Sequence, residues 1–208
     1  MTPWSALSLT LAMVAVPGLA FGFRWFGRPG GDLGSLFVQL AMFALSAVML
    51  WAVRAKEGRD WASLGLARPR AGETALLTLG ALAALFAGLA ALYFGANALG
   101  LPFGQGDSGL PPKWLLLAMV VRAGAVEEVT YRAVAIDRMA ELTGSRTLGW
   151  LIPLLIFGAL HYPQGIVVVL YATLAGGILS ALFLWKRNLW ANMSAHFLLD
   201  FLMNFVLS

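Results

Sequence analysis

The stretch "TALLTLGALAALFAGLAALYFG", residues 74–95, is 22 residues long and contains no charged side chain. A helix that crosses the hydrocarbon core of a bilayer needs about 20 predominantly apolar residues. Six further runs of this character lie at about 4–23, 33–53, 112–139, 148–162, 166–185 and 188–207. The sequence therefore predicts an all-α, polytopic transmembrane helical bundle of about seven spans, within a range of six to eight.

The composition of the whole chain agrees with this class. Hydrophobic residues make up 60% and charged residues 12% of the 208 residues, whereas a soluble domain has about 45–50% and about 25%. We find no internal repeat and no long linker, so we expect a single transmembrane domain over residues 1–208. The first run lacks a basic leading segment and a small-residue cleavage site, which favours a retained helix over a signal peptide.

Cysteine usage and net charge exclude several classes of function. The chain has no cysteine, which excludes disulfides, a thiol nucleophile and cysteine-bound metal. Its net charge is +4, but the basic residues lie in loops beside apolar runs, where they normally set membrane topology. We therefore expect the lipid bilayer as a partner and no nucleic acid.

The distribution of basic residues also predicts an orientation. If seven spans alternate, nine cationic residues share one side: five in the loop 54–73, and Arg138, Arg146, Lys186 and Arg187. The other side has three, namely Arg24, Arg28 and Lys113. The positive-inside rule then places the first side and the N-terminus in the cytoplasm and the C-terminus outside. The two arginines that follow the first run favour the opposite orientation of that run.

The loop 54–73 is the longest polar insert. Its sequence is "RAKEGRDWASLGLARPRAGE". We expect it to lie on the membrane surface with Trp61 and Leu64 as interfacial contacts. The alternative is a plain solvated loop.

The stretch "GAVEEVTYRAV", residues 124–134, places ionisable groups inside an apolar run. Such a group costs about 2.5–3.5 kcal/mol on insertion scales and usually faces a cavity or a partner. Glu128 and Arg132 have the spacing of a helical ion pair. Glu127 points about 100° away from Glu128, with Tyr131 as its own neighbour four residues later. We therefore expect a structural pair and a second carboxylate, Glu127, available as a general acid or base. The alternative is a polar network that only fixes helix packing.

The two histidines of the chain both lie in apolar runs. His161 stands at the end of the fifth run in "FGALHYP", where Pro163 disfavours further helix. His196 belongs to a stripe of polar residues spaced four apart along the seventh run: Asn192, His196, Asp200 and Asn204. For Arg122 we expect either a pair with Asp200 or a position at the membrane surface.

Three motifs resemble those of one known family. "EEVTYR" is similar to Glu-Glu-x-x-x-Arg, "FGALH" to Phe-x-x-x-His and "HFLLD" to His-x-x-x-Asn/Asp, in that order on three separate runs. Together they resemble the CPBP family of intramembrane proteases, which includes the type II CAAX prenyl endopeptidases and the bacterial CAAX amino-terminal (Abi) proteases. The resemblance covers residues 112–205. The first three runs match only in being hydrophobic.

The resemblance implies a helical bundle with a polar cavity in the membrane. It implies catalytic residues Glu127, His161, His196 and Asp200, with Glu128 and Arg132 in support. Glu127 would be the general base for a water, with His161 orienting it or sharing the proton, and His196 would face the oxyanion. Asp200 stands where the prenyl endopeptidases have asparagine, and it would hold or charge His196.

The need for a metal stays open between two readings. The mechanism implied by the resemblance requires none, and we expect no cofactor. The alternative is a zinc site made by Glu127, His161 and His196 with an open position for water. Neither His-x-x-x-His nor Glu beside His occurs in the chain.

We therefore predict an intramembrane endopeptidase that acts on a protein or peptide substrate. As an integral, multi-pass membrane protein it would lie in a bacterial inner (plasma) membrane. One alternative is a non-proteolytic membrane immunity or scaffold protein. The other is a proton-coupled transporter, against which the absence of paired similar halves counts. The sequence identifies neither the substrate nor whether it is prenylated.

Overall fold

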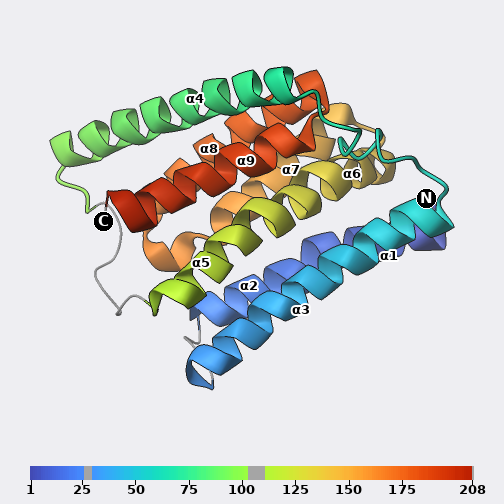
Figure 1. Ribbon diagram of the computed structural model, residues 1–208, viewed down its shortest axis with the longest axis horizontal. Coiled ribbons are helices and arrows are strands. Elements are labelled where there is room, and N and C mark those ends of the chain that lie inside the picture. The colour runs from blue at the N-terminus through green and yellow to red at the C-terminus, as the bar shows by residue number, and fades with distance from the viewer. Residues whose placement is uncertain (26–29, 103–110, 208) are drawn as a thin grey trace.

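The computed structural model describes residues 1–25, 30–102 and 111–207 (Figure 1). Within these ranges all regular secondary structure is helical, and it forms seven continuous helical segments. Three come from the N-terminal half: α1 (Pro3–Thr10) joined to α2 (Val16–Trp25) by the π-helical turn Leu11–Ala15, α3 (Gly31–Trp51) extended by Ala52–Lys56, and α4 (Ala71–Ala98).

The other four segments and their connecting turns carry the residues of the three motifs. They are α5 (Lys113–Arg122) continued through the π-helical stretches Ala123–Glu127 and Val129–Ala135 into α6 (Ile136–Thr143), then α7 (Arg146–Ala159), α8 (Ile166–Lys186), and α9 (Leu189–Phe201) extended by Leu202–Val206. A short 3-10 turn, Tyr162–Gln164, precedes α8. The predicted all-α bundle with seven helical runs is confirmed, and the run boundaries agree within a few residues.

Length and composition set four of these helices apart as candidate membrane spans. They cover Pro3–Gly22, Gly31–Lys56, Ala71–Ala98 and Ile166–Lys186. The helix Arg146–Ala159 is apolar but shorter. The segments 113–143 and 189–206 differ from these four because they carry the buried arginine, glutamate and histidine side chains: Arg122, Glu127, Glu128, Arg132, Arg138 and His196.

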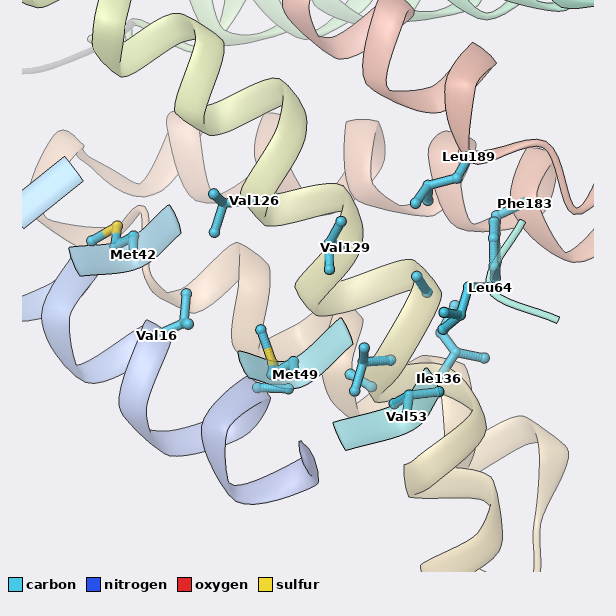
Figure 2. Packing of buried hydrophobic residues seen from close by; sticks show 14 residues of the cluster. Val16, Met42, Met49, Val53, Leu64, Val126, Val129, Ile136, Phe183 and Leu189 are labelled. Carbon is cyan, nitrogen blue, oxygen red and sulfur yellow. The ribbon is translucent and has the colours of Figure 1, made fainter. Parts of the chain in front are cut away.

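The long helix α5–α6 occupies the middle of the bundle. In Figure 1 it runs between α2 and α3 on one side and α7, α8 and α9 on the other, and α4 covers α8 and α9. Buried apolar side chains of α3 and its extension, such as Met49 and Val53, meet Val129 and Ile136 of the central segment (Figure 2). This packing holds the charged stretch of the central helix in a fixed position.

The loop between α3 and α4 folds back onto the bundle. Leu64 is only 2% exposed and packs beside Phe183 and Leu189 (Figure 2). The Leu189 N–H donates to the Gly65 carbonyl oxygen at 2.8 Å. The prediction that Leu64 is an interfacial contact is therefore wrong, because the loop closes over the turn between α8 and α9. Trp61 is 44% exposed, as a surface contact requires.

The loop after α3, the helix α6 and the turn between α8 and α9 meet at one end of the bundle. Their charged side chains form an end cluster: Glu57, Arg59, Asp137, Arg138, Glu141 and Arg187. Arg138 is 2% exposed and contacts Glu57 and, at 3.0 Å, Glu141. The prediction that these loops lie on the same side of the bundle is confirmed. Arg138, however, is buried in ion pairs with Glu57 and Glu141 and is not a free cation of a loop. Of the three cations predicted for the other side, Arg28 and the side chain of Arg24 lie outside the described residues.

Candidate active site

A cavity of about 270 Å³ lies between the central helix, α7, α8 and α9. All four predicted catalytic residues line it: Glu127, His161, His196 and Asp200. Most of the remaining wall is apolar and includes Leu116, Phe157 and Leu179. The fold thus brings together ionisable groups from three helical segments that lie far apart in the sequence.

Glu128 is a fully buried carboxylate beside this cavity and accepts hydrogen bonds from three side chains. It has no exposed surface, and its Oε1 accepts from Arg132 Nη1 at 2.7 Å and from His196 Nδ1 at 2.8 Å. Its Oε2 accepts from Asn192 Nδ2 at 3.2 Å. Arg132 Nη2 also donates to the Gly176 carbonyl at 3.1 Å. The predicted Glu128–Arg132 pair is confirmed, and it also anchors the helix that carries His196.

Glu127 faces the cavity and forms an ion pair with Arg122. Arg122 Nε donates in turn to Gln39 Oε1 on α3 at 2.9 Å. Five residues along an α-helix leave two side chains about 140° apart. Here the π-helical stretch Ala123–Glu127 intervenes, and its wider i→i+5 turn brings Arg122 and Glu127 to one face. Arg122, expected beside Asp200 or at the membrane surface, thus has Glu127 and Gln39 as partners.

The two nitrogens of His196 have different surroundings. A carboxylate can only accept, so Nδ1 carries the hydrogen in its bond to Glu128. Nε2 lies 3.9 Å from Glu127 Oε2 and 3.7 Å from Asp200 Oδ2. Nε2 therefore faces two carboxylates on the cavity wall. The tautomer of His196 is set by Glu128, a role that we had expected for Asp200.

His161 lies in the turn that follows α7 and is half-buried. Its Nδ1 is 2.9 Å from the Phe157 carbonyl oxygen and donates to it. In the neutral ring this makes Nε2 the proton acceptor. The Phe157 ring packs edge-on against both imidazoles, with centroids 5.1 Å from His161 and 6.5 Å from His196. Phe157 of the second motif therefore holds both histidine rings in place.

The donor set that would bind zinc is not assembled here. Over the described ranges, no group of three His, Cys, Asp or Glu side chains lies close enough to hold a metal ion. Glu127 is occupied by Arg122, and His196 Nδ1 is occupied by Glu128. Both contacts would have to break before Glu127 and His196 could bind zinc together, so the described arrangement does not fit the zinc alternative.

Gln39 and Tyr171 are among the polar residues near the site that sequence reasoning missed. Gln39 is the amide of an otherwise apolar run, and its burial on α3 shows only when α3 packs on α5. Tyr171 of α8 lines the cavity and is the phenol of its run. Each is an isolated polar side chain at mid-helix, which is the signal that could have found them.

Comparison with known proteins agrees with the motifs. Residues 109–202 match the family model described as "Type II CAAX prenyl endopeptidase Rce1-like". Over this segment, which is 94 of the 208 residues, the chain is similar to the Rce1-like family. The segment contains all the motif residues named above, so the predicted resemblance to the CPBP and CAAX proteases is confirmed. The similarity supports an endopeptidase of the CAAX-protease type, and four helices of the described residues are long and apolar enough to cross a membrane. No curated protein and no solved structure matches the chain.

Proposed function

We propose that this protein hydrolyses peptide bonds of a membrane-associated protein or peptide, with a water activated by Glu127. The observation that carries this proposal is the shared cavity, since Glu127, His161 and His196 all line it. A general base must reach the water that it deprotonates. A cavity of about 270 Å³ leaves room for water and a short stretch of extended peptide beside Glu127.

In the proposed first step, water is held between Glu127 and His161. Its oxygen bonds to the carbonyl carbon while Glu127 takes one proton and the C=O π electrons move onto the oxygen. The resulting oxyanion accepts a hydrogen bond from protonated His196 Nε2, because stabilising this charge is usually the largest catalytic contribution. In the second step the C–N bond breaks, and the proton on Glu127 passes to the leaving nitrogen.

The surrounding residues keep these groups in place. Arg122 orients Glu127, and Gln39 orients Arg122. Glu128 and Arg132 fix the ring of His196 from the opposite side. Rigid support of this kind matters because catalytic groups must stay close to the productive geometry. We assign Asp200 to the charge balance of His196, since its Oδ2 lies 3.7 Å from Nε2.

Two further parts of the proposal concern setting. The mechanism runs on these side chains without a metal, which agrees with the arginine and imidazole contacts of Glu127. We place the protein in a bacterial inner membrane with the loop 54–73 on the cytoplasmic side, on the basis of its cationic residues.

The test is cleavage of peptides by the purified full chain in liposomes. CAAX-type peptides with and without a prenyl group are incubated in heavy-oxygen water, and the products are analysed by mass spectrometry. Hydrolysis releases two fragments with one heavy oxygen in the new carboxyl group. Glu127→Gln should give no fragments, while Glu73→Gln at the exposed start of α4 should act like wild type. A folded wild type that cleaves none of the peptides would favour the immunity or scaffold alternative.

A further inference from the structure

Tyr171 is a polar residue of the cavity wall that the mechanism above does not use. It lies on α8, whose small residues Ala172, Ala175 and Gly176 line the same cavity. Its ring packs against the buried cluster that contains Leu85, Leu179 and Leu199. Contacts from α4, α8 and α9 therefore hold this ring in a fixed orientation.

The hydroxyl of Tyr171 is buried and has no hydrogen-bond partner in the part of the chain that the structure describes. Five other side chains there also have a buried polar atom without a partner, but none of these residues lines the cavity. Burying a hydroxyl without a hydrogen-bond partner costs free energy. We therefore expect a ligand or a water to supply the acceptor for this hydroxyl.

The charge beside this hydroxyl restricts the kind of acceptor. Asp200 is the charged group that acts electrostatically on Tyr171, and its carboxylate lies 3.7 Å from His196 Nε2. A second anion next to Asp200 would be repelled. A neutral oxygen is favoured there, and the carbonyl of a peptide backbone is the neutral acceptor that every peptide carries.

We propose that Tyr171 donates its hydroxyl hydrogen to a backbone carbonyl oxygen of the bound peptide, beside the bond that is cleaved. This inference rests on the proposed function. It makes Tyr171 a substrate-binding residue of α8 in the cavity that Glu127 and His161 also line. The contact forms equally in the ground state and the transition state, so its loss should raise KM and leave kcat nearly unchanged.

The experiment compares Tyr171→Phe with wild type in liposomes, with Tyr93→Phe on α4 as a control whose hydroxyl is not at the cavity. KM should rise about threefold to tenfold in Tyr171→Phe, which corresponds to one hydrogen bond. Binding of the uncleaved peptide is measured in the Glu127→Gln background. There, Tyr171→Phe should raise Kd by the same factor, and Tyr93→Phe should change neither value.

Other results would contradict this inference, the proposed function or both. Unchanged KM and Kd would mean that the hydroxyl bonds only water. A fall in kcat with unchanged Kd would make Tyr171 a donor to the oxyanion instead. A peptide that binds wild type without being cleaved contradicts the proposed function alone, and the Kd comparison then still tests Tyr171. A peptide that binds none of the proteins contradicts both.

Discussion

The central helix α5–α6 joins two charged regions that look alike in sequence and differ in structure. The end cluster lies where α6, the loop after α3 and the α8–α9 turn meet. The second region, here called the site cluster, consists of Arg122, Glu127, Glu128, Arg132 and His196. Each contains an almost fully buried arginine, Arg138 at 2% and Arg132 at 1% exposure.

The difference lies in what the carboxylates face. In the end cluster, Glu57 and Glu141 face arginines, and the contacts tie loop to helix. In the site cluster, Glu127 and Glu128 both approach an imidazole, and that imidazole lines a cavity. Buried charge alone therefore indicates a structural role. Carboxylates that converge on a histidine at a cavity indicate chemistry.

The largest expected effect is a loss of activity on substitution in the site cluster, with no such loss on substitution in the end cluster. His196→Ala removes the group assigned to the oxyanion and should lower kcat about 10²–10³-fold. The substitution also removes the Nδ1 hydrogen bond to buried Glu128, so the thermal unfolding temperature should fall as well, and kcat is measured on the folded fraction. Arg59→Ala, in the end cluster, should leave kcat unchanged. Cleavage rates and unfolding curves of both purified variants check this, and an active His196→Ala would remove the distinction between the regions.

The next effect compares the two buried arginines. Arg132→Ala and Arg138→Ala each remove the arginine partner of a buried carboxylate, which costs about 3–5 kcal/mol of folding stability. Only Arg132→Ala should also lower the activity of the protein that remains folded, because it frees Glu128 and thereby His196. The measurement is activity per folded molecule after size-exclusion chromatography. Equal specific activity of the two variants would contradict the account.

The smallest effect compares two aspartates. Asp200→Asn keeps the shape of the side chain and removes a charge 3.7 Å from His196 Nε2, so kcat should fall severalfold with unchanged stability. Asp137→Asn weakens a partly exposed pair with Arg187, so stability should fall by less than about 1 kcal/mol with unchanged kcat. An Asp200→Asn enzyme with wild-type kcat would show that Asp200 serves packing.

Much of this architecture could be predicted because membrane helices obey simple length rules. Seven apolar runs correspond to seven helical segments, and the i, i+4 spacing identified the Glu128–Arg132 pair. The three motifs named side chains that line one cavity. These features depend on local spacing or on a family pattern, so sequence reasoning reaches them.

The features that escaped prediction depend on contacts between distant segments or on irregular backbone. Arg122 reaches Glu127 through a π-helical turn, which α-helical periodicity does not describe. Leu64 is buried because its loop folds onto the α8–α9 turn. The bond from His196 to Glu128 joins two helices whose relative depth no spacing rule sets.

The central claim is that Glu127 activates water in this cavity without a metal. Its most direct test is the rate of peptide cleavage by wild type and Glu127→Gln in liposomes, before and after dialysis against a strong chelator. The account predicts an unchanged wild-type rate after dialysis and a rate at least about 10²-fold lower for Glu127→Gln, whose amide cannot take the proton. Wild-type turnover by Glu127→Gln, or activity lost on chelation and restored by zinc, would contradict it.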